Sequence, residues 1–290
     1  MFEYTCLTVV PEPQGFVAAV RGLDLRAPLS AAAQRDLMGA WSRHAVLYFP
    51  EQQLEPATLE RVSAYLGPFG DDPYVTPMEA YQHVIEVRRE AGETAPIFGG
   101  MWHSDWSFQA TPPSATLLYG DIVPTSGGDT VFADGCRAFE ALSPAMQNLL
   151  LPLNAVHSAA PAYGPKGLFA RDDATRSMQI IVSPEADKTE IHPIVRRHPL
   201  SGRCSLYVNH VYTLGIEGMR ADESQALLEF LFKHMTRNEF VYRHRWQPHM
   251  LLIWDNRRVL HYADGGYEGQ RRLMYRTTVA GERPQAARAA

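Results

Sequence analysis

Cysteine is scarce, basic charge is not in excess and no long apolar run is present in this chain of 290 residues. The three cysteines, Cys6, Cys136 and Cys204, are too few and too far apart for a disulfide framework or a zinc-binding spacing, which favours a reducing, cytoplasmic setting. The formal net charge of −5 gives no basic footprint, so no nucleic-acid partner is expected. No apolar run approaches the roughly 20 residues that span a bilayer, and the first residues lack the pattern of a signal peptide, so no membrane association is expected.

The rest of the composition is that of an ordinary globular protein, with 46% hydrophobic and 20% charged residues. Short strand patterns interrupted by turns dominate the chain, and the clearest are 45–49, 251–254 and 273–279. The stretch 155–190 has no clear period, and we expect a long loop over a site there.

Helices are predicted at fewer places. A helix is expected from Ser30 to about residue 43, another from Pro56 to residue 66, and a third after Ser143. Asp222 with Gln225 resembles a capping box that opens a fourth. A few helices at the ends of many short strands predict a mainly β fold, such as a β-sandwich or jelly roll with added helices.

One triplet stands out among the 11 histidines. His103-Ser104-Asp105 is the sole His-x-Asp or His-x-Glu sequence in the chain. In an extended segment, side chains two residues apart point to the same face, so His103 and Asp105 could hold one metal ion together. About one such triplet is expected by chance in a chain of this composition, so a surface histidine beside a turn aspartate is an equally open interpretation.

His261 supplies a second element. It follows the buried segment 251–254 and precedes Gly265-Gly266. Two histidines and one carboxylate, with three coordination positions left open, form the ligand set of non-haem Fe(II) oxygenases. Taken alone, a histidine such as His261 is more often a hydrogen-bonded core residue than a metal ligand.

Arg272 and Arg276 are the third element. They lie four apart in the last predicted strand and therefore on one face. Two unpaired buried cations would cost several kcal/mol each, so they need anionic partners. A bound dicarboxylate would supply them, and the planar guanidinium suits a carboxylate well. An internal salt bridge to an acidic residue is the alternative. We expect Arg271, Arg257 and Arg258 to be surface charges.

The sequence resembles a known family over most of its length. The likeness covers roughly residues 10–284 in an ordered series of segments: GLDLRAPLS, WHSDWSFQATPPSATLL, PTSGGDTVFAD, HPIVRRHPLSGRCSLYVNHVY, RWQPHMLLIWDN and HYADGGYEGQRRLMYRTTVAG. By these segments the chain is similar to the TauD/TfdA family of 2-oxoglutarate-dependent dioxygenases. The resemblance implies a double-stranded β-helix (jelly-roll, cupin-like) core in a single domain over residues 1–290, assembled as a homodimer or homotetramer.

The resemblance also implies an activity. An enzyme of this kind uses Fe(II), 2-oxoglutarate and O₂ to hydroxylate a small organic substrate, with release of succinate and CO₂. An anionic substrate is expected here: a sulfonate, a sulfate ester, an aryloxyalkanoate or an amino-acid-derived carboxylate. Taurine dioxygenase proper, a zinc hydrolase and a non-catalytic jelly-roll protein that binds a small ligand are the alternatives.

Residue roles follow from the same resemblance. His103, Asp105 and His261 would bind the iron, while Thr130 and Arg272 would hold the distal carboxylate of 2-oxoglutarate. Arg276 would lie close to both the reaction and the substrate's anionic group. Candidates for the substrate pocket, each of which could instead be a packing residue, are Tyr74, Met101, Trp106, Tyr119, His210 and Tyr212.

Two departures from taurine dioxygenase concern the substrate. The stretch after the second predicted helix, Gly70 to Val75, contains no histidine, where taurine dioxygenase offers one to its substrate. Gly99 stands where that enzyme has a polar residue, four positions before the metal motif. Recognition of taurine itself is therefore left open.

Overall fold

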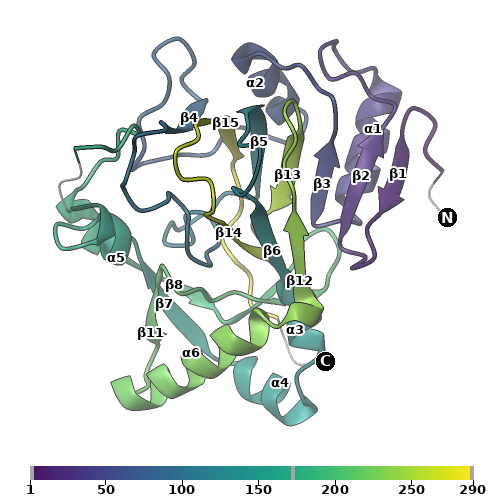
Figure 1. Ribbon diagram of the computed structural model, residues 1–290. Helices are drawn as coiled ribbons and strands as arrows, with labels where there is room; N and C mark the ends of the chain where they lie inside the picture. The colour runs from purple at the N-terminus through teal and green to yellow at the C-terminus, as the bar shows by residue number, and fades with distance from the viewer. Residues whose placement is uncertain (1–2, 171–173, 288–290) are drawn as a thin grey trace.

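The computed structural model describes residues 3–170 and 174–287, and strands dominate it (Figure 1). This confirms a mainly β fold with added helices. Its largest sheet is seven-stranded and antiparallel except where β2 runs parallel to β3. In spatial order the strands are β1 (Thr8–Pro11), β2 (Val17–Arg21), β3 (Val46–Phe49), β13 (Leu251–Asp255), β5 (Ala115–Ile122), β15 (Arg272–Val279) and β4 (Ile85–Arg89).

Three smaller antiparallel sheets complete the β structure. One three-stranded sheet has the order β12 (Val241–His244), β6 (Thr130–Asp134) and β14 (Val259–Ala263). Another has the order β11 (Thr213–Ile216), β7 (Asn154–Ser158) and β8 (Thr189–Pro193). The last is the pair β10 (Cys204–Leu206) and β9 (Val195–Arg197).

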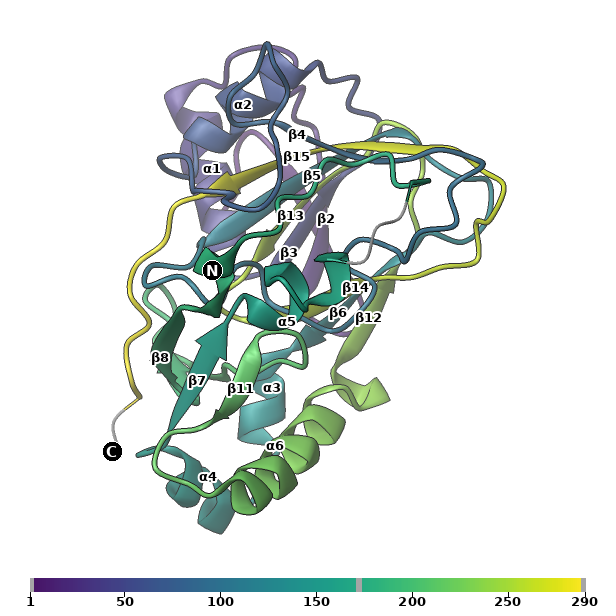
Figure 2. The same ribbon diagram turned by 90° about the vertical axis from the view of Figure 1, so that its left-hand side faces the viewer.

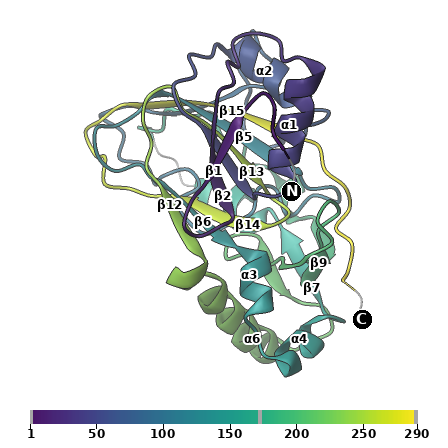
Figure 3. The same ribbon diagram turned by 90° about the vertical axis from the view of Figure 1, so that its right-hand side faces the viewer.

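The helices gather at two ends of the molecule (Figures 2 and 3). At one end, α1 (Ala31–Trp41) and α2 (Pro56–Ala64) lie beside the large sheet. At the other end lie α3 (Gly135–Glu140), α4 (Pro144–Leu150) and α6 (Ala221–Met235). The short α5 (Ala160–Tyr163) and the 3₁₀ turns Leu168–Ala170, Pro184–Asp187 and Asn238–Phe240 occupy connections. No helix within the described ranges is long and apolar enough to cross a membrane.

Strand β13 shows how the core is divided. Its alternate residues point to opposite faces of the sheet, as strand geometry requires. Leu251 and Ile253 belong to a core cluster formed with α1 and α2. Leu252 and Trp254 belong to another, which includes Phe132 of β6 and joins the large sheet to the β12–β6–β14 sheet. Both faces are buried, as the continuous apolar run predicts.

Two local predictions are wrong. Helix α6 begins at Ala221, and Glu223 caps the backbone N–H of Arg220 at 3.1 Å, so the predicted box of Asp222 and Gln225 is misplaced. The stretch 155–190 is not one long loop, since it holds most of β7, all of α5 and the start of β8.

Arg257 and Arg258 are also not surface charges. Both are buried, because each has a carboxylate within reach. Arg257 pairs with Asp255 at 2.6 Å, and Arg258 pairs with Asp134 at 2.6 Å. The sequence showed a charged turn after a strand but gave no sign of these partners.

Candidate metal centre and adjoining pocket

His103 and His261 come together through their backbones. The N–H of His103 donates to the carbonyl of His261 at 3.0 Å, and the N–H of His261 donates to the carbonyl of His103 at 2.8 Å. This bridge attaches the loop that carries His103 to strand β14 and sets the two imidazoles side by side. The Nε2 atoms of His103 and His261 lie 3.6 and 3.7 Å from Asp105 Oδ1. The structure therefore brings together all three predicted ligands, and all three are buried.

The surroundings orient these side chains for a metal ion. His103 Nδ1 lies 2.7 Å from the carbonyl of Met101, so a proton assigned to Nδ1 leaves the Nε2 lone pair available. Thr116 Oγ1 donates to Asp105 Oδ2 at 2.6 Å and so leaves Oδ1 toward the histidines. Contacts of this kind fix the ligands of metal sites, and the donor set suits a divalent transition-metal ion.

The charge states also fit a metal ion. Burial raises the pKa of Asp105, but Arg276 and the two histidines outweigh it and hold that pKa well below its ordinary value. Burial, with help from His103, lowers the pKa of His261 to about 3. Carboxylate and neutral imidazole are the forms that bind a metal.

Arg272 is a buried cation that has no carboxylate partner among residues 3–170 and 174–287. Its Nε and Nη2 atoms have no hydrogen-bond partner in the part of the chain that the structure describes. The ring of Tyr267, 6.0 Å from the guanidinium carbon, is its aromatic neighbour. Burial lowers the pKa of Arg272. Because an unpaired buried charge is costly, the site calls for an anion.

Thr130 faces the same space. It is buried in β6, and its Oγ1 accepts a 2.9 Å hydrogen bond from Trp246 Nε1, which leaves the hydroxyl proton free to donate. A narrow cavity is lined by both Thr130 and Arg272, together with the metal triad. An anion bound at Arg272 and Thr130 would thus lie within one cavity of the metal.

Arg276 differs from Arg272 because it has internal partners. Its Nη1 donates to Asp72 Oδ1 at 2.7 Å. Its Nη2 lies 3.1 Å from Asp105 Oδ1, without a well-directed hydrogen bond. The guanidinium also lies over the ring of Trp106, 5.2 Å from its centre. Asp105 and Asp72 overcome the effect of burial and raise the pKa of Arg276. Of the two interpretations of this arginine pair, an internal salt bridge therefore applies to Arg276, whereas Arg272 has no such partner among the described residues.

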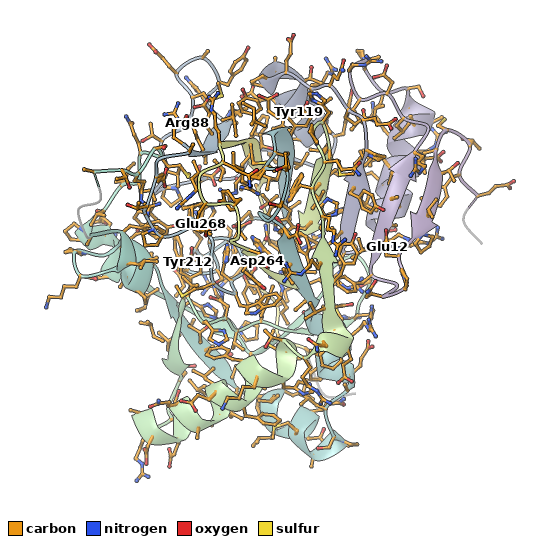
Figure 4. The ribbon with its side chains drawn as sticks, in the orientation of Figure 1. Glu12, Arg88, Tyr119, Tyr212, Asp264 and Glu268 are labelled. Atoms are coloured by element: carbon orange, nitrogen blue, oxygen red, sulfur yellow. The ribbon has the colours of Figure 1, made fainter. Side chains whose placement is uncertain are left out.

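A larger pocket of about 350 Å³ adjoins the triad and is lined in part by His103 and Asp105. Of the predicted substrate residues, it is lined by Met101, Trp106 and Tyr212. Aromatic lining residues that the sequence did not single out are Phe98, Tyr163, Phe169 and Tyr262. Figure 4 shows Tyr212 near the centre of the molecule, with Asp264 to one side of it in this view. Aromatic rings and aliphatic side chains such as Ile97, Leu168 and Val211 form much of the pocket wall, which suits an apolar group.

Three other candidates lie outside this pocket. Tyr74 stacks on Tyr163 at 4.7 Å between ring centres and packs behind the wall. Tyr119 belongs to the core beneath α1 and α2, and its hydroxyl lies 2.8 Å from His249 Nδ1; Figure 4 shows it well away from Tyr212. His210 stacks on Phe232 of α6 at 4.1 Å. Their aromatic character gave no means of separating packing from pocket.

The structure explains why glycine stands at position 99. Its φ of +73° lies in the left-handed region, which favours glycine. A Cβ atom here would lie 3.3 Å from His103 Cε1. A side chain at position 99 would therefore press on a metal-site histidine.

The family model for "Taurine catabolism dioxygenase TauD, TfdA family" matches residues 8–278. The alpha-ketoglutarate-dependent sulfate ester dioxygenase of Pseudomonas putida is 32% identical over 96% of this chain and 91% of its own length. The (S)-phenoxypropionate/alpha-ketoglutarate-dioxygenase of Sphingobium herbicidovorans is 30% identical over 94% and 95%.

A solved structure is similarly close. The crystal structure of AAD-2 in complex with Mn(II) and N-oxalylglycine superimposes with a TM-score of 0.79 at 29% identity, and the match covers 97% of this chain and 100% of AAD-2. N-oxalylglycine is an isostere of 2-oxoglutarate (alpha-ketoglutarate). The chain belongs to the TauD/TfdA family and is a 2-oxoglutarate-dependent dioxygenase that uses Fe(II) and O₂.

Proposed function

We propose that His103, Asp105 and His261 hold the iron and that Arg272 and Thr130 hold the distal carboxylate of 2-oxoglutarate. The proposal rests on the buried guanidinium of Arg272, whose Nε and Nη2 atoms have no hydrogen-bond partner among the described residues and which shares one cavity with the triad. A dicarboxylate bound to the metal by one end would place its other end at this cation. Iron with 2-oxoglutarate and O₂ supplies the oxidising power, and the protein supplies orientation and a dry site.

The chain's own residues have separate tasks in this scheme. The Met101 carbonyl and the Thr116 hydroxyl keep His103 and Asp105 in their binding orientation. Arg276 lies against Asp105 and places positive charge beside the metal. Arg276 is therefore proposed to be a catalytic residue that also contacts 2-oxoglutarate at the end that binds the metal.

The substrate is proposed to be a small organic molecule held in the aromatic pocket beside Trp106 and Tyr212 and hydroxylated there. The relatives named above act, by their names, on a sulfate ester and on a phenoxypropionate. Both have an apolar body, which the ring-lined pocket suits.

The wider setting is part of the same proposal. A double-stranded β-helix core is supported by the shared core cluster that joins the large sheet to the β12–β6–β14 sheet. One domain over residues 1–290 and a cytoplasmic location are supported by the family match along the chain and by three unpaired cysteines. The protein is proposed to form a homodimer or homotetramer, and light scattering would measure its oligomeric state.

Succinate release from 2-oxoglutarate tests the proposal. The protein is supplied with Fe(II), ascorbate and air, together with a panel of sulfonates, alkyl sulfates, aryloxyalkanoates and their uncharged analogues. Release stimulated by one class, and lost in His103→Ala, is expected. Turnover that needs no O₂ would point to a hydrolase, and no release from iron-loaded protein would point to a non-catalytic ligand-binding protein.

A further inference from the structure

Asp72 lies in the loop after α2 and is held by several donors. Its Oδ1 accepts hydrogen bonds from Arg276 Nη1 at 2.7 Å and from Trp106 Nε1 at 2.6 Å. Its Oδ2 accepts one from Thr278 Oγ1 at 2.9 Å. The side chain is 12% exposed. A carboxylate held by three donors, two from β15 and one from the loop that carries Trp106, is a fixed part of the site and not a mobile surface group.

Arg276, the arginine that pairs with Asp72, faces the narrow cavity. Arg276 lines the space shared by the triad, Thr130 and Arg272, and it is not among the residues that line the aromatic pocket. Within residues 3–170 and 174–287, no arginine or lysine lines that pocket. Asp264, at its rim, is paired with Arg243. The pocket therefore offers an incoming anion no partner of its own among these residues.

The charges of the filled site lead to the same conclusion. The positive charges are two on the metal ion and one each on Arg272 and Arg276. The negative charges are one on Asp105 and two on 2-oxoglutarate. One positive charge would remain to attract a substrate anion, but Asp72 neutralises it. A further anion in this buried space would have no counter-charge among residues 3–170 and 174–287 and would bind poorly.

On the basis of the function proposed above, we propose that Asp72 determines substrate specificity. It supplies the negative charge beside Arg276 that a substrate anion would otherwise have to supply to balance the site. The preferred substrate is then an uncharged molecule with an aryl or short alkyl body, bound by the rings of the aromatic pocket, in contrast to the anionic substrate expected from the family resemblance and to the sulfate ester and phenoxypropionate in the names of the relatives. Arg276 serves the metal end of the site, and Asp72 acts on the substrate through it.

A matched pair of ligands separates charge from shape. Phenoxyacetate and phenoxyethanol share an aryl ether body and differ in a carboxylate against a hydroxymethyl group. Binding is measured by calorimetry to the full chain loaded with Mn(II) and N-oxalylglycine, so that no turnover is needed. We expect the wild-type protein to bind phenoxyethanol on the order of 10-fold more tightly than phenoxyacetate, because the acid lacks a counter-charge.

Asp72→Asn should reverse this order. The amide keeps the size of the side chain but removes its negative charge, which leaves one positive charge of the site uncompensated, so phenoxyacetate should become the tighter ligand by on the order of 10-fold. Asp71→Asn is the matched control, since Asp71 is the adjacent, exposed aspartate and its removal changes the net charge by the same amount. This control should keep the wild-type order, whereas a merely structural role of Asp72 would weaken both ligands together.

Several results would overturn the proposal. Wild-type protein that prefers phenoxyacetate contradicts it without any variant, as does protein that binds neither ligand. An unchanged ratio in folded Asp72→Asn contradicts it as well. Failure of Mn(II) and N-oxalylglycine to bind at all would instead contradict the function proposed above, so the two failures are distinguishable.

Discussion

His103 and His261 exchange two backbone hydrogen bonds, of 3.0 and 2.8 Å, although they lie 158 positions apart in the sequence (261 − 103 = 158). A loop and a strand are thereby joined at the point where both carry a metal-site imidazole. The backbone bridge therefore sets the separation of the two imidazoles.

The first prediction concerns Arg272. Arg272→Met should raise the concentration of 2-oxoglutarate needed for half-maximal succinate release on the order of 100-fold, because the distal carboxylate loses its cation. The same variant should raise the melting temperature of the ligand-free protein, since it removes an unpaired buried charge. Both are measured on purified protein, by assay and by thermal unfolding.

Arg271→Met is the control for that variant. Arg271 is the preceding residue in sequence, and its exposed side chain pairs with Glu90 at 3.3 Å. Its removal should change neither quantity appreciably. Equal effects of the two substitutions would show that the cavity cation has no special role.

Gly99→Ala should weaken metal binding. The new Cβ would lie 3.3 Å from His103 Cε1 and would sit on a backbone with φ of +73°, which costs about 1 kcal/mol for a residue other than glycine. A displaced imidazole should lower Fe(II) affinity on the order of 10-fold, as measured by competition with a chelator. Gly92→Ala, where a Cβ meets nothing within 4 Å, should leave that affinity unchanged. Unaltered affinity in Gly99→Ala would refute the close contact.

His244 predicts an acid-dependent loss of stability. Burial lowers its pKa from 6.5 to about 3, so the unfolded chain takes up a proton that the folded protein excludes. Its contribution is therefore complete above pH 6.5 and is lost as the pH falls toward 3, by up to about 1.4 kcal/mol per pH unit. His244→Phe keeps the edge-on packing against Trp246 but cannot titrate. Urea unfolding at pH 7 and pH 5 should show a smaller loss in the variant; an equal loss would contradict the buried neutral state.

The sequence supported the fold class and the metal site because both depend on local patterns. Leu251 to Trp254 is an unbroken apolar run, and the structure buries both of its faces. His103 and Asp105 form one triplet, and Arg272 and Arg276 share one strand face, so each pair needed only the geometry of an extended chain. The roles of Thr130 and Arg272 came from family resemblance, which carries long-range information that a single pattern lacks.

The partners of charged residues could not be predicted in the same way. Asp72 lies 204 positions before Arg276 in the chain, and Asp134 lies 124 before Arg258. Such pairs depend on how distant segments meet, and no local periodicity encodes that. For the same reason the sequence does not indicate that Arg258 is buried, and it does not separate a core aromatic such as Tyr119 from a pocket residue such as Tyr212. Arg257 is different: its partner Asp255 lies only two positions away, and the local pattern still does not indicate that the pair is buried.

Visible absorption of the protein with Fe(II) and 2-oxoglutarate, under strictly anaerobic conditions, tests whether His103, Asp105 and His261 hold one iron ion to which 2-oxoglutarate binds. We predict a weak charge-transfer band that appears only when both are present and that is lost in His261→Ala. A His261→Ala protein that keeps the full band would contradict the triad.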